Sequence, residues 1–306
     1  MVEPHYGEYL GISQAVYWTL TETDTDLISA IGLEDEGDNE KVIGNDNRRL
    51  VSRHDRTPGS QKYSIVRLLC VFTDGQGTKE YGHGTGFMIA EDFMITAGHN
   101  VYEHYGAVKG PVRAITAYFG HEGNGCWRER RRADLVATSQ RWIDGRVGRS
   151  GDIAVVRFLP RAQVDELGDW VLPLRPFIPK DIAPRGSEWL TIVGYPLDKS
   201  ERARDMYEAY DYVQWDLQRD GMLLKYKIST SGGQSGSPIL FPDGKTVIGV
   251  HVSGNIVAQC NFGCPIGVLG AMIEPYMRFF RGEGYTLRNT EWRDGLWIQH
   301  LDLTVP

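Results

Sequence analysis

The chain contains three short motifs whose residue types together could carry out nucleophilic hydrolysis. In the first, residues 232–238 (GGQSGSP), glycines surround a serine. A serine hydroxyl attacks a carbonyl only when it lies near a base and beside donors that receive the developing negative charge. Glycines permit the tight turn that aims neighbouring N–H groups at one point, here those of Gly233 and Ser235. Taken alone, the motif is equally typical of a glycine-rich turn with a surface serine.

The other two motifs supply a base and a carboxylate. Residues 93–100 (FMITAGHN) predict an apolar strand that ends just before His99, and histidine is the side chain best suited to proton transfer near neutral pH. Residues 150–158 (SGDIAVVRF) place Asp152 at the start of another apolar strand, where a partly buried carboxylate needs a partner. A catalytic imidazole would be such a partner. Each motif alone also fits a structural histidine or an aspartate in a turn.

The order of the three residues selects one chemistry. His99, Asp152 and Ser235 follow one another at separations of 53 and 83 residues. This is the order of the chymotrypsin template, and it differs from the orders found in subtilisins and in α/β-hydrolases. The sequence therefore predicts a serine nucleophile, a histidine base and an aspartate that orients the base.

The elements that must position these residues are predicted to be short β-strands. Many of the runs alternate apolar and polar residues, as half-buried antiparallel strands do, and their number favours an all-β sandwich or barrel. The best helix candidate is 273–280, with Pro275 tolerable only in its first turn. The predicted strands are 63–72, 87–90, 112–119, 153–159, 190–194, 222–229 and 247–252.

The chain resembles the V8-like glutamyl endopeptidases, a branch of the trypsin-like serine proteases, from residue 42 to residue 280. The motifs that carry the resemblance are 96–99 (TAGH), 151–156 (GDIAVV), 191–196 (TIVGYP), 229–238 (STSGGQSGSP) and 247–251 (VIGVH).

The resemblance implies two six-stranded antiparallel β-barrels with the active site in the cleft between them, and a short C-terminal helix. The implied division is a first barrel at 42–160 with His99 and Asp152, a linker at 161–184, and a second barrel with the helix at 185–281. Ser235 belongs to this second barrel. A C-terminal tail of unknown role follows at 282–306.

Substrate specificity is also implied by the resemblance. His251 matches the histidine that, in Glu-specific relatives, donates to the carboxylate of the residue before the cut, and Thr230 matches a hydroxyl residue of the same pocket. A buried acid needs such a donor. The alternative is that His251 is a core or rim histidine in a pocket of another preference. The residues that adjoin His251, at 252–255 (VSGN), lack the tryptophan that is expected from the best-known member of the family.

Activation is expected to involve residues 1–41, which hold ten acids and one base. Trypsin-like zymogens place an aspartate before the nucleophile to pair with a freed α-amino group, but this chain has Gln234 there. V8-like enzymes instead mature to a chain that begins near a valine, and Val42 fits that position. We therefore expect an acidic prosegment that an activating protease removes before Val42, with the new amine near the substrate pocket. A non-inhibitory extension is the alternative.

Composition restricts the classes of partner and cofactor that are expected. The net charge of −7 lies mainly in the acidic head, so neither nucleic acid nor a membrane surface is an expected partner, and the arginines at 128 and 130–132 read as a solvated loop. Cysteines and histidines lack the paired spacing of a zinc site, and no metal or cofactor is expected. The expected partners are protein or peptide substrates, and the default state is a monomer. No signal peptide is visible, so an intracellular location is expected if Met1 is the native start.

Three other readings remain open. A trypsin-fold protein that is catalytically silent, or that regulates by binding peptides, would keep the barrels without turnover. A signalling protein could use the same proteolysis to trigger a response. An esterase could use the same triad, although its fold and order favour peptide bonds.

Overall fold

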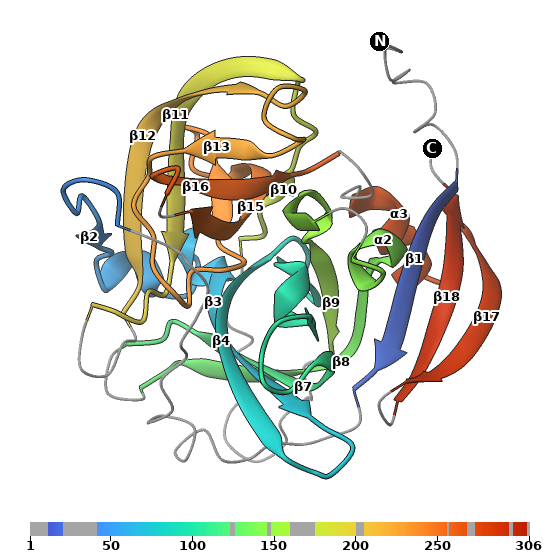
Figure 1. Cartoon of the computed structure of the whole chain (residues 1–306). Coiled ribbons are helices and arrows are strands. Elements are labelled where there is room, and N and C mark those ends of the chain that lie inside the picture. The colour runs from blue at the N-terminus through green and yellow to red at the C-terminus, as the bar shows by residue number, and fades with distance from the viewer. Residues whose placement is uncertain are drawn as a thin grey trace.

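The protein is almost entirely β-structure, with two short α-helices in the described residues (Figure 1). The structure is a computed structural model that describes residues 12–20, 42–122, 126–145, 148–159, 175–199, 205–255, 257–267, 273–293 and 296–304. The predicted all-β class is confirmed.

The first six-stranded unit is a closed barrel. Its strands pair in the order β3-β4-β5-β9-β8-β7, and β7 pairs back onto β3. Along β3, every second side chain from Val66 to Phe72 enters one apolar cluster inside the barrel, because successive strand residues point to opposite faces. The bounds are β3 (Ile65–Thr73), β4 (Lys79–Met88), β5 (Phe93–Thr96), β7 (Gly110–Phe119), β8 (Glu129–Ser139) and β9 (Ala154–Phe158), with the short β6 (Tyr102–Glu103) beside β7.

The second six-stranded unit is a curled half-barrel. Its strands pair in the order β13-β16-β15-β14-β11-β12, and among the described residues no ladder joins β12 to β13. This is a difference from two closed barrels. Two short strands extend the sheet, β2 on β12 and β10 on β15. The bounds are β2 (Arg49–Leu50), β10 (Ile178–Pro179), β11 (Arg185–Gly194), β12 (Tyr207–Asp216), β13 (Leu224–Tyr226), β14 (Pro238–Leu240), β15 (Thr246–Asn255) and β16 (Cys260–Pro265).

The first described strand and the last two described strands lie together in one sheet beside the first barrel (Figure 1). Strand β1 (Ile12–Thr19) lies between β8 and β18 (Leu296–Thr304), and β17 (Tyr285–Arg293) forms the outer edge of this side sheet. Val16 and Trp18 are fully buried, and the Trp18 indole N–H donates to the Val112 carbonyl at 3.0 Å. Part of the expected acidic extension and most of the unassigned tail are therefore strands of the fold.

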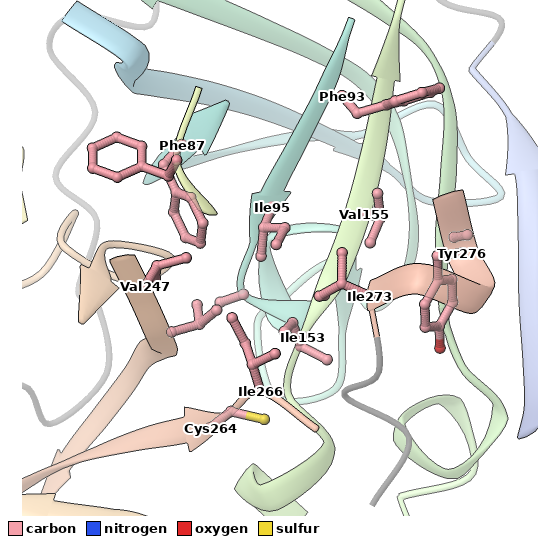
Figure 2. Close-up of a cluster of buried hydrophobic side chains, with 14 of the residues drawn as sticks. Phe87, Phe93, Ile95, Ile153, Val155, Val247, Cys264, Ile266, Ile273 and Tyr276 are labelled. Atoms are coloured by element: carbon pink, nitrogen blue, oxygen red, sulfur yellow. The ribbon is translucent and has the colours of Figure 1, made fainter. Parts of the chain in front are cut away.

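An apolar cluster joins the two six-stranded units and the helix α3 (Ile273–Phe280). It includes Phe87 and Ile95 from the first barrel, Val247 and Ile266 from the second, and Ile273 from α3 (Figure 2). The helix spans the predicted residues, with its proline in the first turn. Because this cluster packs side chains of both units, their relative position is fixed by close packing and not by the chain connection alone.

The predicted linker is described from residue 175 onward, and residues 160–174 lie outside the described part of the chain. The described portion is packed and not free. Phe177 is buried, its N–H donates to the Met88 carbonyl at 2.8 Å, and its ring contacts Phe87 edge-on. Residues 175–182 thus contact both units: Phe177 is bonded to β4 of the first, and β10 pairs with β15 of the second.

The arginine cluster at 128–132 is not a solvated loop, since Arg130, Arg131 and Arg132 lie on β8. Arg131 is buried and its guanidinium donates to the carbonyls of Glu91 and Leu159. The period-two pattern of a strand turns one of three consecutive arginines inward.

All four cysteines are free. Cys260 and Cys264 begin and nearly end β16. Four residues of extended strand span about 13 Å, which is beyond the roughly 7 Å that a disulfide can bridge between Cα atoms. The small closed loop that their spacing permits does not form.

Candidate active site

His99 lies in a 3₁₀ turn (Gly98–Asn100) that follows β5 directly. Its backbone N–H donates to Asp152 Oδ1 at 2.8 Å, and its Nδ1 lies 2.9 Å from Asp152 Oδ2. A carboxylate only accepts, so Nδ1 carries the proton of this second bond and Nε2 is left as the basic nitrogen. Gly98 permits the approach, because a Cβ there would lie 3.0 Å from Asp152 Oδ1.

Asp152 is completely buried at the start of β9. Burial alone would raise the pKa of its carboxyl, but the His99 imidazole and the Arg149 guanidinium outweigh that effect and lower this pKa to about 2. The carboxylate is therefore ionised at neutral pH, and it fixes the tautomer and the orientation of the imidazole.

Arg149 is a third member of this cluster. Its Nη1 donates to Asp152 Oδ2 at 2.8 Å and lies 3.1 Å from His99 Nδ1. The motifs in the sequence do not mark this residue as part of the site. The only signal in the sequence is an arginine three positions before the aspartate, and this spacing does not predict that a 3₁₀ turn (Gly148–Gly151) directs its side chain toward Asp152.

Ser235 lies in the loop between β13 and β14, whose shape depends on two glycines in the left-handed region. Gly233 has φ +85° and Gly236 has φ +92°. A Cβ on Gly233 would lie 2.6 Å from the Tyr195 carbonyl oxygen, and a Cβ on Gly236 would collide with the Thr85 carbonyl oxygen. Among the hydrogen bonds of the described residues, none uses the Gly233 N–H. This N–H could therefore donate to a bound negatively charged oxygen.

Hydrogen bonds between the two units bring Ser235 next to the His99 turn. The Ser235 carbonyl accepts from the Thr85 N–H at 2.8 Å and from Asn100 Nδ2 at 3.0 Å. The Thr85 hydroxyl donates to the Gly233 carbonyl at 2.8 Å. Thr85 and Asn100 belong to the first barrel, so the loop of the second unit that contains Ser235 is bonded to the residue that follows His99.

His251 and Thr230 flank the same loop. The His251 N–H donates to the Ser237 carbonyl at 2.9 Å, and the His251 carbonyl accepts from the Gly236 N–H at 2.8 Å. The His251 Nδ1 lies 2.7 Å from the hydroxyl of Tyr226. Thr230 is fully buried, and its hydroxyl has no hydrogen-bond partner among the described residues. Such a group normally costs about 1–3 kcal/mol, so it is a site that a polar ligand atom could satisfy.

Val42 lies near Thr230, because the residues next to them, Ile43 and Ser229, are hydrogen-bonded to each other. The Ser229 hydroxyl accepts from the Ile43 N–H at 3.1 Å and faces the Ile43 carbonyl at 3.3 Å. The start of the described segment at residue 42 is thereby held beside residues 229 and 230. Val42 is itself 36% exposed.

An ion-pair network anchors the same segment to the second unit. Arg48 is buried and donates to Asp46 and to Asp198, in the latter case at 2.8 Å from Nη1. Lys199 also contacts Asp46. The hydrogen bond from Arg48 lowers the pKa of Asp46 well below its usual range. This Arg48 clasp, formed with Asp46 and Asp198, holds the segment that follows Val42 against the second unit.

Comparison with known proteins identifies the family to which this chain belongs. The family model for the trypsin-like peptidase domain matches residues 84–250, more than half of the chain, and this range includes His99, Asp152 and Ser235. The chain belongs to the trypsin-like peptidase family. The expected kinship with V8-like serine proteases is also confirmed, since a glutamyl endopeptidase of Staphylococcus aureus (strain MW2) is 33% identical over 104 residues. That match covers 34% of this chain and 29% of the relative, so the chain matches under a third of the relative's length.

Solved structures show the same fold for this trypsin-like peptidase. A Glu endopeptidase superposes with a TM-score of 0.59 at 23% identity, covering 79% of this chain and 100% of that one. The protease Anisep from Arthrobacter nicotinovorans superposes with a TM-score of 0.54 at 16% identity, covering 71% of this chain and 93% of that one.

In the described part of the chain, no three His, Cys, Asp or Glu side chains are grouped so that they could hold a metal ion. None of the described helices combines the length and the apolar character that crossing a bilayer requires.

Proposed function

We propose that the protein is a serine endopeptidase with His99, Asp152 and Ser235 as its catalytic triad. The observation that carries the proposal is the double contact of His99 with the buried Asp152, together with the bonds that tie the Ser235 carbonyl to Thr85 and Asn100. Nucleophile, base and orienting carboxylate come from motifs far apart in sequence, and membership of the trypsin-like peptidase family supports their roles.

In the proposed mechanism, the Ser235 hydroxyl attacks the scissile carbonyl carbon while His99 Nε2 takes its proton. The N–H groups of Gly233 and Ser235 stabilise the oxyanion of the tetrahedral intermediate. Imidazolium then gives the proton to the leaving amine nitrogen as the C–N bond breaks, which leaves an acyl-enzyme on Ser235. A water molecule, deprotonated by His99, hydrolyses that ester and restores the serine.

The proposed preference is for Glu before the scissile bond. It is supported by Thr230, whose buried hydroxyl lacks a partner, and by His251, whose backbone is bonded to the nucleophile loop on both sides. Because the Tyr226 hydroxyl uses its one hydrogen to donate to the Phe262 carbonyl at 2.9 Å, it accepts a hydrogen bond from the His251 Nδ1–H. A protonated His251 would then offer a charged Nε2 donor to a carboxylate, the strong form of hydrogen bond.

The proposed activation is a cut before Val42 by another protease. Two observations support it, the bonds between Ile43 and Ser229 and the Arg48 clasp. Both would hold a new α-amino group beside Thr230, where it could pair with an acidic side chain of the substrate.

A peptide panel that varies only the residue before the cut tests these proposals together. Glu and Gln are the decisive pair because they differ in charge and hardly in shape. The full chain and a chain cut before Val42 run in parallel, with Ser235→Ala as the inactive control. We expect cleavage after Glu at least about 10²-fold faster than after Gln, in the cut form, and none with Ser235→Ala.

The other outcomes separate the parts of the proposal. Equal rates before and after the cut would remove the activation step. Cleavage after a different residue would keep the triad and remove the roles of His251 and Thr230. No cleavage of any peptide by either form would favour a catalytically silent, peptide-binding trypsin-fold protein.

A further inference from the structure

The carboxylate that orients His99 is shared with a permanent cation. Asp152 Oδ2 accepts from His99 Nδ1 at 2.9 Å and from Arg149 Nη1 at 2.8 Å. Oδ1 is bonded to the His99 N–H. The guanidinium carbon of Arg149 also lies over the Tyr105 ring, 5.8 Å from the centre of the ring. Its side chain is 20% exposed, whereas Asp152 is fully buried.

This arrangement changes the charge against which His99 works. Without Arg149, protonation of His99 would take the His99–Asp152 pair from −1 to 0. With Arg149 present, the same proton takes the three groups from 0 to +1, and Nδ1 lies 3.1 Å from a guanidinium nitrogen. A like charge at this distance disfavours the charged form of a titrating group, and the partial burial of the cluster limits screening by water.

We propose that Arg149 is a positioning residue that fixes Asp152 and keeps His99 unprotonated, and so able to act as a base, at more acidic pH. This inference rests on the proposed role of His99 as general base. It assigns to Arg149 the pH range of catalysis and leaves the nucleophile and the substrate preference unchanged.

Other titratable groups near the cluster do not supply the same charge. The Cys264 thiol donates to the Ser150 carbonyl at 3.1 Å, and burial raises the pKa of this thiol, so it is neutral. Tyr105 presents its ring to Arg149, and His104 bonds the Trp142 carbonyl at 2.8 Å. Among the described neighbours, the cation bonded to Asp152 is Arg149.

The test compares the acid limb of kcat/KM in the full chain, cut where necessary, with Arg149→Met, Arg149→Lys and Arg157→Met. Arg157→Met is the matched control, because it removes one arginine, on β9, from an ion pair with Asp134 on β8. We expect Arg149→Met to move the limb about one unit to higher pH, Arg149→Lys to restore most of the original position, and Arg157→Met to leave it unchanged. A limb that stays in place with Arg149→Met would overturn the proposal.

A second measurement needs no turnover. In a Ser235→Ala background, an NMR titration follows the His99 ring, identified by its loss in His99→Gln. Its midpoint should rise by about one unit on adding Arg149→Met, whether or not any peptide is cleaved. An unchanged midpoint contradicts the role of Arg149, whereas a raised midpoint without cleavage supports it and places the failure in the proposed endopeptidase activity.

Discussion

At the scale of single residues, the nucleophile loop depends on glycine at position 233. Its φ of +85° is costly for other residues, and a Cβ would press on the Tyr195 carbonyl and on Leu197 at 2.6 and 2.8 Å. We expect Gly233→Ala to move the Gly233 N–H away from the oxyanion position and to lower kcat by about 10²–10³-fold. Steady-state kinetics on the best peptide of the panel measure this effect.

The matched control is Gly244→Ala. Gly244 has a φ of +67°, but nothing lies within 4 Å of a Cβ placed there. This variant carries the same kind of backbone strain, about 1–2 kcal/mol, without a clash near Ser235. Equal losses of kcat in both variants would show that backbone strain in general, and not the oxyanion donor, is responsible.

Asp152 should also make stability depend on pH. Its carboxyl has a pKa of about 2 in the folded protein, below its ordinary value of 3.8. The unfolded chain therefore binds this proton first, so the stabilisation is complete above pH 4 and is lost as pH falls toward 2. The difference is on the order of 2 kcal/mol. Urea unfolding of wild type and Asp152→Asn should show a gap at pH 5 that narrows toward pH 2. A gap that does not change with pH would contradict this linkage.

At the scale of elements, β1 makes the N-terminal region part of the folded body. The strand lies between β8 and β18, and the Trp18 side chain on it is fully buried. A cut before Val42 would break one peptide bond but none of the ladders on either side of β1. We expect the cut chain to retain the N-terminal piece on native size-exclusion chromatography and to release it in denaturant. Release under native conditions would show that β1 is dispensable.

The contribution of β1 to the free energy of unfolding can be tested by substituting two tryptophans. Trp18→Ala removes a buried ring and its bond to the Val112 carbonyl, and should lower the free energy of unfolding by about 3–5 kcal/mol. Trp292→Ala is the control, since this ring is 60% exposed on β17. It should cost less than about 1 kcal/mol. Chemical unfolding compares the two, and equal losses would contradict the structural role assigned to β1.

The sequence predicted those parts of the protein that are encoded locally. The motifs around His99, Asp152 and Ser235 are strand ends and glycine turns, so their residue types could be recognised from the sequence without knowledge of the fold. Strand β1 was missed because Ala15, Val16 and Trp18 are buried on both faces and give no alternation.

The side sheet and the arginine were harder to predict for other physical reasons. Strand β17 was missed because most of it is exposed, which leaves little apolar signal. The contact between Arg149 and Asp152 depends on the direction of a side chain in the 3₁₀ turn 148–151, and composition does not determine that direction. The orphan hydroxyl of Thr230 is likewise a property of its surroundings in three dimensions.

At the scale of the whole molecule, catalysis requires two β-units to stay in one relative position. His99 and Asp152 belong to the closed barrel, and Ser235 belongs to the half-barrel. The shared apolar cluster in Figure 2 holds the units together over a broad area. Thr85 aligns the Ser235 loop with the first barrel more closely, because its N–H donates to the Ser235 carbonyl and its hydroxyl donates to the Gly233 carbonyl.

Thr85→Val tests this adjustment, because it keeps the shape and removes the hydroxyl. The Tyr195 N–H, 3.1 Å from that hydroxyl, and the Gly233 carbonyl would both lose a buried partner. We expect a loss of about 1–3 kcal/mol in the free energy of unfolding and a fall of about tenfold or more in kcat. Thr246→Val is the control, since its hydroxyl bonds Asp243 on a surface turn. If Thr85→Val lost stability but kept its kcat, the apolar cluster alone would suffice to align the two halves of the site.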